Sequence, residues 1–465
     1  MRRIIETLVL LSVAGLIGRT WCVQGLLVPF QVTSASMAET LAGPHRAVAC
    51  ADCRFPFLYG SDDDADPQWA VCPNCGHVEN DPLENPRSPG DRLLIDRSAL
   101  LFRSPRRWEV VAFRAPDAAS KVYVKRVVGL PGESIEIRDG DVYVDGQIAR
   151  KSLAQQRAMA ILVHDARWSP QIEPAPPPRW QAEAGNTAWR RFEEGFLRCP
   201  SPKTGSEGLA PDGVDWLTYV HQRRLAAEPG QSEPVAVTDH YGYNPAVSTR
   251  RQQPVPLADL ILSFRIVSLQ GEGQLCLRAT DGRDEFVVQI EPTWRRCTTL
   301  RNGQALEAPA PCRLPDSWKN VRVDVSLVDR QFLLALNERP AIVLPYDRVP
   351  APAQTTARPF SIGGSGIALE VRDLRVYRDV YYRQAPGGED RPGHAAQVQL
   401  APDEYFVLGD NSPVSQDSRT WQRGAGVAVH LLVGRPLLVH LPLRGIAVGR
   451  WTFQVPDVAR IRYIR

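Results

Sequence analysis

Short runs of alternating apolar and polar residues, separated by glycine- and proline-rich segments, recur along most of this 465-residue chain. Successive side chains of a β-strand point to opposite faces, so a period of two is typical of strands with one buried face. Such runs lie within residues 92–146, within residues 260–376 and at Glu404–Leu408. We therefore expect a mainly β protein. The length exceeds that of one ordinary core and predicts about two or three domains.

Four of the nine cysteines form two C-x-x-C pairs, Cys50 with Cys53 and Cys72 with Cys75. This spacing is typical of a four-cysteine zinc ribbon, in which the metal is structural because no coordination position stays open. Gly76 follows the second pair and suits a turn that needs a positive φ. Two disulfides are the alternative if the compartment is oxidising.

The N-terminus combines basic and apolar residues. Arg2 and Arg3 precede an apolar stretch over residues 8–18, and apolar residues resume at 26–28. A clean spanning helix needs about 20 apolar residues, so this segment is either a marginal membrane anchor or a secretory signal peptide. Both alternatives place the rest of the chain outside the cytoplasm, because basic residues favour an inside N-terminus.

Two proline- and glycine-rich segments, residues 172–178 and 385–393, have the composition of linkers. Between them, strand-like runs recur at the intervals of a two-sheet sandwich. The order of these runs, with Trp318 before one strand and Leu369–Tyr377 at the close, resembles concanavalin-like or laminin-G-like jelly-roll domains. A fold does not assign a function, so a glycan ligand, a protein partner and a purely surface-shaping role all stay open.

Several function classes find no support. The chain has no G-x-S-x-G elbow, no H-E-x-x-H helix and no phosphate-binding glycine loop, which argues against the commonest hydrolases and NTPases. Its formal net charge is only +3 and no basic face stands out, so we expect no nucleic-acid partner.

A serine and a lysine remain as candidates for chemistry. Ser36 follows the N-terminal segment, and Lys125 lies in the alternating run Tyr123–Val128. On a strand, Lys125 shares a face with Tyr123 and Val127, and burial on that face would lower the lysine pKa toward a neutral amine. A neutral lysine can act as the base of a Ser-Lys nucleophilic pair. Alone, however, a strand lysine is usually a solvated charge.

Four segments, in order, resemble the type I signal peptidase family. They are its serine box at Phe30–Leu41, the following strand at Gly90–Asp96, its lysine box at Tyr123–Glu133 and its C-terminal box at Gly409–Arg419. The resemblance covers about 150 residues of a catalytic core, and family members with a large β insertion carry it between the last two boxes. It implies a Ser-Lys serine endopeptidase with a β-rich core that rests on the membrane and needs no cofactor for its chemistry.

The resemblance also implies residue roles. Ser36 matches the nucleophile and Lys125 the general base. Ser34 matches a hydroxyl that joins the Ser36 backbone N–H in the oxyanion hole, and Ser415 matches a serine that orients the lysine amine.

Three further positions of the C-terminal box match supporting residues. Gly409 matches a glycine packed close to the lysine, and Asp417 with Arg419 matches a structural ion pair. One position departs from the family pattern, because Glu39 stands where proline is usual. This change puts an acid near the cleft and raises the question of a weakened enzyme.

The expected organisation is therefore a signal-peptidase-type catalytic core with an N-terminal transmembrane helix, a four-cysteine ribbon insertion and an inserted β-sandwich. The anchor is expected to be retained, because cleavage after Ala35 would detach it at the nucleophile itself. The predicted ranges are 1–29 for the anchor, 30–48, 88–160 and 397–465 for the three parts of the core, 49–79 for the ribbon, and 180–383 for the sandwich.

The resemblance implies cleavage of exported preproteins with Ala-x-Ala sites by an enzyme of the plasma membrane. Its N-terminus would be cytoplasmic and its catalytic domain extracytoplasmic. A second hypothesis is an exported, membrane-anchored glycan-binding or scaffold protein whose protease core is inactive. A self-cleaving Ser-Lys repressor relative is a third, and the absence of a DNA-binding helical domain argues against it.

Overall fold

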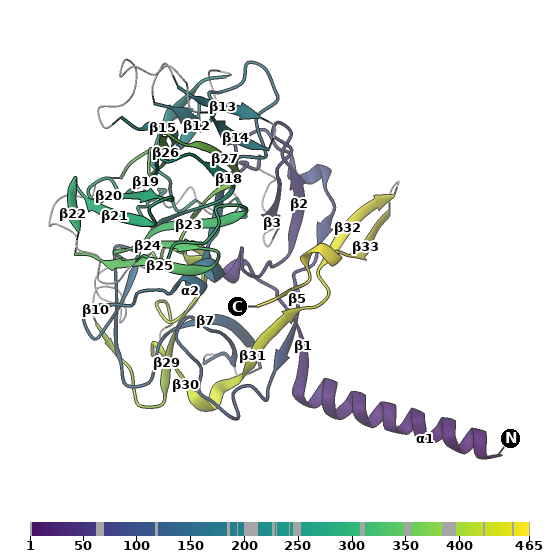
Figure 1. The fold of residues 1–465 in the computed structure, drawn as a ribbon. Helices are drawn as coiled ribbons and strands as arrows, with labels where there is room; N and C mark the ends of the chain where they lie inside the picture. The colour runs from purple at the N-terminus through teal and green to yellow at the C-terminus, as the bar shows by residue number, and fades with distance from the viewer. Residues whose placement is uncertain are drawn as a thin grey trace.

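The computed structural model describes residues 2–61, 69–116, 120–183, 187–192, 194–199, 213–225, 228, 230–240, 242–244, 253–306, 312–347, 355–383, 397–421, 424–448 and 451–464. Strands dominate these residues and pair only antiparallel, so the protein is mainly β, as predicted (Figure 1).

One sheet, here called the core sheet, joins strands from the N-terminal and C-terminal parts of the chain. Its strand order is β1 (Leu27–Gln31), β5 (Arg92–Asp96), β31 (Leu432–Val439), β6 (Val110–Arg114), β7 (Val122–Gly129), β29 (Glu404–Leu408) and β30 (Gly426–Ala428), and β34 (Arg462–Tyr463) pairs with β31. A smaller sheet has the order β10 (Gln147–Ile148), β9 (Asp141–Val144), β8 (Ser134–Arg138) and β28 (Val398–Gln399). Because Val127 of β7 pairs with Val407 of β29, segments far apart in sequence meet at the centre of the core sheet.

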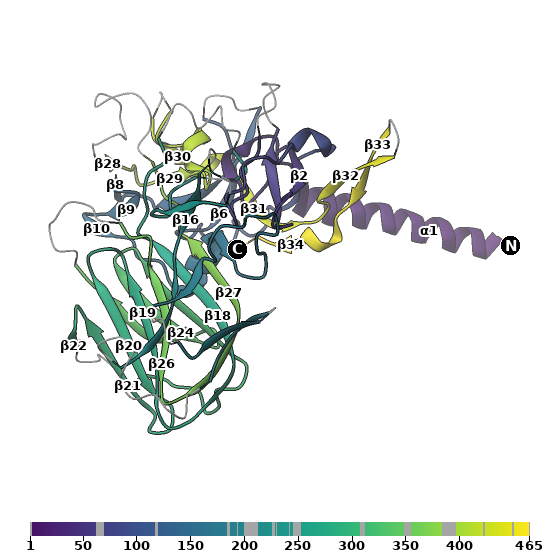
Figure 2. The same ribbon diagram turned by 90° about the horizontal axis from the view of Figure 1, so that it is seen from above.

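Two further sheets form a sandwich. The first has the order β13 (Trp189–Phe192), β14 (Gly195–Arg198), β27 (Ala368–Arg378), β18 (Leu260–Gln270), β23 (Val321–Val328), β24 (Gln331–Leu336) and β25 (Arg339–Pro345), with β11 (Ile161–Asp165) also on β27. The second has the order β12 (Trp180–Ala182), β15 (Asp215–Tyr219), β26 (Phe360–Ser365), β19 (Gln274–Thr280), β20 (Glu285–Glu291), β21 (Arg296–Arg301) and β22 (Gln304–Leu306). Figure 2 shows these strands gathered beside the core sheet.

Apolar side chains from both sheets fill the space between them. The rings of Phe286 on β20 and Phe332 on β24 stack with their centroids 5.0 Å apart. Val288 and Leu334, from the same two strands, are fully buried in this cluster. The module is therefore a two-sheet sandwich with its own core, as the alternating runs predicted.

The sandwich begins and ends at neighbouring strands. Ile161 of β11 pairs with Arg378 of β27, so a strand N-terminal to the predicted range 180–383 also belongs to this sheet. Residues 172–178, predicted as a linker, form neither helix nor strand. The second predicted linker, residues 385–393, lies outside the described residues.

The cysteine-bearing segment lies between the sandwich and the hairpin of β32 and β33 (Figure 1). Its sheet has the order β3 (Pro56–Gly60), β2 (His45–Ala49) and β4 (Arg87–Ser88). Two hairpins complete the strands, one of β16 (Gln222–Arg224) with β17 (Ser232–Pro234) and one of β32 (Leu443–Val448) with β33 (Trp451–Pro456).

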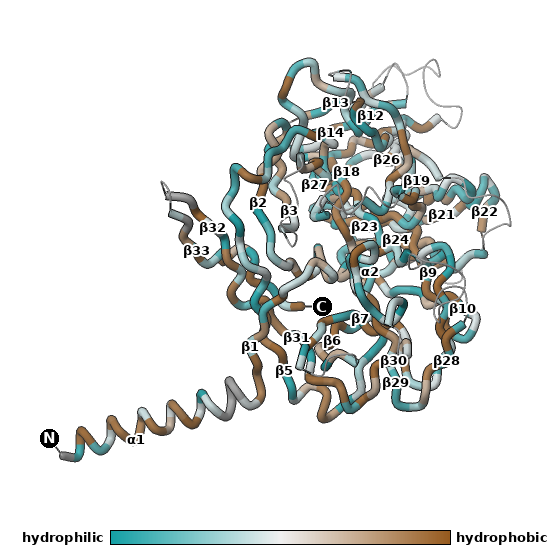
Figure 3. Tube along the Cα trace, turned by 180° about the vertical axis from the view of Figure 1, so that it is seen from behind, coloured by the Kyte–Doolittle hydropathy of each residue, from teal (hydrophilic) through white to brown (hydrophobic). Residues whose placement is uncertain are grey.

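Helices are few. α1 spans Arg2–Gly18 and continues into a π-helical segment at Arg19–Leu26, and α2 spans Leu153–Met159. Short 3-10 turns lie at Ala35–Met37, Pro82–Glu84, Ser412–Val414, Val429–Leu431 and Val458–Arg460. Helix α1 extends away from the body of the protein and carries mostly hydrophobic residues (Figure 3).

The N-terminal helix does not meet the requirements of a membrane span. Over the residues that the structure describes, no helix is both long enough and apolar enough to cross a membrane. The transmembrane helix predicted within residues 1–29 is therefore not found. Helix α1 has 17 residues, where a spanning helix needs about 20, and the regular α-helix ends just before Arg19 interrupts the apolar run.

Candidate active site

Ser36 and Lys125 line one cleft, here called the serine cleft, with a volume of about 810 Å³. Ser36 lies in the 3-10 turn Ala35–Met37, here called the serine turn, which follows β1. Lys125 lies in β7. The sequence placed these residues about 90 positions apart, and the fold brings them to the walls of the same cleft.

Lys125 is almost entirely enclosed. Its side chain is 3% exposed, and its Nζ donates a hydrogen bond to Ser415 Oγ at 3.0 Å. Burial lowers the pKa of Lys125 to about 8, while the negative charge of Asp417 raises it and Arg419 lowers it. A substantial fraction of the amine is therefore neutral at mildly alkaline pH, as a general base requires.

The serine turn is held by its backbone. The Ala38 N–H donates to Ala35 O at 3.0 Å, and the Leu41 N–H donates to Met37 O at 2.7 Å. Ser34 Oγ donates to Ser36 Oγ at 3.3 Å, so the hydroxyl that the resemblance assigned to the oxyanion hole lies beside the candidate nucleophile.

Within the described chain, no hydrogen bond joins Ser36 to Lys125. Lys125 Nζ instead donates its hydrogen bond to Ser415 Oγ. Catalytic contacts are often long in a site without substrate and shorten when substrate binds, so this arrangement is compatible with a dyad.

Gly409 lies where a side chain would collide with both ends of the site. A Cβ atom built there would lie 2.2 Å from Ser415 Oγ and 2.4 Å from the backbone oxygen of Ser36. The Gly409 N–H donates to Asp417 Oδ2 at 3.0 Å. Because Gly409 has no side chain, the end of β29, the serine turn and Ser415 can lie close to one another.

Asp417 and Arg419 form a buried pair. Arg419 donates from Nε to Asp417 Oδ1 at 2.8 Å and from Nη2 to Asp417 Oδ2 at 2.7 Å. Burial raises the pKa of Asp417, but the Arg419 guanidinium outweighs it and keeps that pKa below the usual range. The carboxylate therefore stays charged and anchors Gly409 beside the site.

Sequence reasoning missed three residues around the serine turn. Arg126, next to Lys125 but on the opposite face of β7, pairs with buried Asp410 at 2.8 and 2.6 Å. The backbone N–H of Asn411 donates to Ser36 O at 3.1 Å, and its Nδ2 donates to Ala35 O at 3.0 Å. Both Asp410 and Asn411 directly follow Gly409 in the C-terminal box, and their position at a strand end could have identified them.

Glu39 is exposed and lies three residues after the candidate nucleophile. Glu39 does not contribute to the shifted pKa of Lys125, whose acidic neighbours are Asp417 and Asp410.

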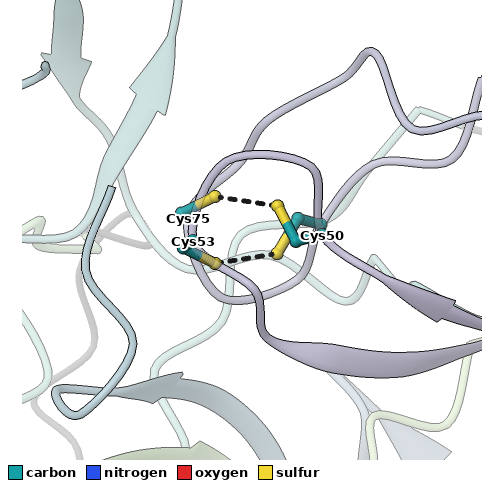
Figure 4. Close-up of side chains that lie close together, drawn as sticks. Cys50, Cys53 and Cys75 are labelled. Atoms are coloured by element: carbon teal, nitrogen blue, oxygen red, sulfur yellow. Dashed lines mark hydrogen bonds between the residues drawn. The ribbon is translucent and has the colours of Figure 1, made fainter. Parts of the chain in front are cut away.

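The four ribbon cysteines converge on one point. Their Sγ atoms all lie within 4.8 Å of one another, and all four residues are buried. Cys50 Sγ lies 3.7 Å from Cys75 Sγ, and Cys53 Sγ lies 3.8 Å from Cys72 Sγ, as Figure 4 shows in part. These distances are too long for disulfide bonds, whose sulfurs lie about 2.05 Å apart.

The cluster fits a tetrahedral zinc ion. With Zn–S bonds of about 2.3 Å, ideal tetrahedral geometry sets the sulfurs about 3.8 Å apart. The turn after each C-x-x-C pair also has the required form, since Arg54 and Gly76 both have positive φ and donate to the first cysteine of their pair. Four cysteine ligands would complete the coordination and leave none for substrate.

Residues 1–174 match the family model described as signal peptidase, peptidase S26. The chain is 37% identical over 76 residues to signal peptidase I V of Bacillus subtilis (strain 168), covering 16% of this chain and 44% of that protein. It is 31% identical over 77 residues to the probable signal peptidase I-2 of Synechocystis, covering 16% and 35%.

These matches are partial, because the chain spans less than half the length of each of these curated relatives. Among solved structures, the carbohydrate-binding module CBM66 from Bacillus subtilis is 14% identical with a TM-score of 0.26, covering 45% of this chain and 99% of that one. At this similarity the comparison carries no argument, and the sandwich rests on the sheet pairing described above.

Proposed function

We propose that the protein is a serine endopeptidase that removes N-terminal signal peptides from exported preproteins, because residues 1–174 match the family model described as signal peptidase, peptidase S26. The observation that carries the proposal is the buried Lys125 on the wall of the cleft that also contains Ser36. Because the pKa of Lys125 is lowered, its neutral amine can act as the general base without a histidine or a metal ion.

In the proposed reaction, neutral Lys125 takes the proton of the Ser36 hydroxyl while Ser36 Oγ attacks the carbonyl carbon of the scissile bond. The Ser36 backbone N–H and Ser34 Oγ–H donate to the oxyanion that develops. The lysine ammonium then protonates the leaving amine, which frees the mature protein and leaves an acyl-enzyme. A water molecule, deprotonated by Lys125, attacks the ester, and the lysine ammonium returns the proton to Ser36 Oγ as the signal peptide leaves.

The edge of β7 offers a place for the substrate. Strand β29 pairs with β7 only from Arg126 to Gly129, and the preceding residues Val122–Lys125 line the serine cleft. Along that half of β7, the described residues show pairing on the β6 side alone. An extended peptide can add there as a strand, which would bring its scissile bond past Lys125 and Ser36. The resemblance implies Ala-x-Ala cleavage sites.

The proposed place of action is the outer face of the plasma membrane, with the N-terminus cytoplasmic. Support comes from the exposed apolar side chains of α1, among them Leu8, which is 59% exposed, and Leu11, which is 64% exposed. Preproteins emerging from the bilayer and the lipid itself are then the partners. Zinc in the ribbon is proposed as a structural metal, and a glycan or protein ligand of the sandwich stays a proposal.

The alternative is an exported binding protein with an inactive core. The buried lysine, its Ser415 contact and the close approach at Gly409 favour an active site, because each would be costly to keep in a scaffold that performs no chemistry. Glu39 leaves all these contacts in place.

The test is cleavage of a preprotein with an Ala-x-Ala site by detergent-solubilised protein across pH 6 to 10. Ser36→Ala and Lys125→Ala should each abolish cleavage. Lys319→Ala, which removes an exposed lysine of the sandwich, should leave it intact. Wild-type kcat/KM should rise about tenfold per pH unit below pH 8 and level off above it. Wild-type protein that is inert on several precursors, or that keeps its activity in the Ser36→Ala variant, would refute the proposal.

A further inference from the structure

A segment of the inserted module reaches the serine cleft. Tyr243 and Asn244 lie in the chain between β17 and β18, yet both line the cleft together with Ser36 and Lys125. Both side chains are buried, at 1% and 4% exposure. The inserted module therefore forms part of the candidate active site itself.

Asn244 and Asn411 bind each other through their side-chain amides. Asn244 Nδ2 donates to Asn411 Oδ1 at 2.8 Å, and Asn411 Nδ2 donates to Asn244 Oδ1 at 2.7 Å. Asn411 is fully buried, and its remaining Nδ2 proton and its backbone N–H bind Ala35 O and Ser36 O. One chain of hydrogen bonds thus runs from the module to the backbone of the nucleophile.

Tyr243 fixes this segment from the other side. Its hydroxyl donates to Pro44 O at 2.9 Å, and its backbone oxygen accepts from the Gly60 N–H at 2.7 Å. A Cβ atom at Gly60 would lie 2.5 Å from the Tyr243 ring, so glycine is required for the ring to lie there. The ring packs against Ala38 and Ala42, which follow the serine turn. Asn244 is therefore held in place independently of Asn411.

We propose that Asn244 is a positioning residue for Ser36, acting through Asn411, so that the inserted module completes the catalytic centre. The effect on turnover rests on the function proposed above, whereas the effect on the serine turn does not. Without the Asn244 amide, Asn411 keeps one donor and one acceptor buried and unpaired. The Asn411 side chain then shifts toward new hydrogen-bond partners, and its contact with the serine turn is no longer fixed. As a result, Ser36 Oγ moves out of line with the carbonyl carbon that it attacks.

Two variants test this positioning role. Asn244→Ala removes the amide, and Gln331→Ala is the control, because it also removes a buried amide of the same module whose contact lies at Lys151 O, away from the cleft. Asn244→Ala should lower kcat about 10- to 100-fold with KM changed by less than about threefold. The pH midpoint of activity should stay near that of the wild type, because Asn244 does not contact Lys125.

A double-variant comparison isolates the chain of contacts. If Asn244 acts through Asn411, the double variant Asn244→Ala/Asn411→Ala should be no slower than Asn411→Ala alone, because the second change removes nothing further. Fully additive losses in kcat would overturn the proposal. A change confined to KM would also overturn it, since it would make Asn244 a wall of the substrate site.

Hydrogen exchange gives a readout that needs no activity. Backbone exchange of the peptide spanning residues 34–42 should rise at least fivefold in Asn244→Ala and stay unchanged in Gln331→Ala. Unchanged exchange in Asn244→Ala, or faster exchange spread evenly over the sandwich, would overturn the positioning role. If wild-type protein cleaves nothing but this local exchange still rises, the proposed function fails while the positioning of the serine turn stands.

Discussion

Replacing Lys125 with methionine tests whether burial penalises the charged lysine. Lys125 is 3% exposed, and burial lowers its pKa from 10.5 to about 8. One pKa unit corresponds to about 1.4 kcal/mol, so holding the ammonium inside the fold at pH 7 costs about 3 kcal/mol relative to the unfolded chain. Methionine removes this cost and also removes the hydrogen bond to Ser415, which is worth about 1 kcal/mol. The variant should therefore be about 2 kcal/mol more stable at pH 7, although it is inactive.

The sign of the pH dependence follows from the two pKa values. Between about pH 8 and pH 10.5 the unfolded wild type binds more protons at Lys125 than the folded protein does, so wild-type stability rises with pH across this window. Below pH 8 the penalty is fully present and constant. The stability advantage of Lys125→Met should thus shrink by about 3 kcal/mol from pH 7 to pH 10.5.

Native-state hydrogen exchange of β7 peptides measures this stability locally, so that unfolding of the sandwich does not interfere. Other groups titrate in the same range, but they do so equally in both proteins and cancel in the difference. Lys319→Met, at an exposed position, is the matched control and should run parallel to the wild type. Parallel wild-type and Lys125→Met curves would show that Lys125 is not buried as described and would remove the physical basis for its role as a base.

Two further predictions concern the serine cleft and the ribbon. Gly409→Ala should lower kcat/KM at least about 100-fold in the preprotein assay, because its Cβ would lie 2.2 Å from Ser415 Oγ and displace Ser415 from Lys125. Near-normal activity would mean that the chain after β29 can move to accommodate the methyl group. Cys72→Ser should reduce bound zinc, measured by elemental analysis of the purified protein, from about one ion per chain to well below that. Equal zinc in variant and wild type would exclude the four-cysteine site.

Local patterns predicted the strands well. The alternating run at Arg92–Asp96 is β5, and the run that starts at Leu260 is β18, because side-chain alternation is encoded within each segment. The same alternation placed Lys125 and Arg126 on opposite faces of β7. It did not show that both faces are buried, since burial depends on what packs against each face.

Long-range contacts were beyond sequence reasoning. Asn244 and Asn411 are 167 residues apart, and neither periodicity nor composition marks Asn244 as part of the site. The C-x-x-C spacing predicted the cysteine cluster because metal ligation demands a fixed local geometry. Hydropathy alone placed a transmembrane helix within residues 1–29 but did not show that the regular α-helix ends at Gly18.

The pairing of Ile161 with Arg378 has a consequence for the order in which the chain folds. Strand β7 must find β29, and about 280 residues separate Val127 from Val407, so closing that loop costs considerable entropy. Once the sandwich has folded, its ends meet, and only about 63 residues remain to be closed, which lowers the entropic cost by about 1.3 kcal/mol. Pairing of β7 with β29 should then be roughly ninefold more favourable. The sandwich, by folding first, thereby shortens the loop that must close between β7 and β29, and the candidate active site is expected to be the last part of the protein to form.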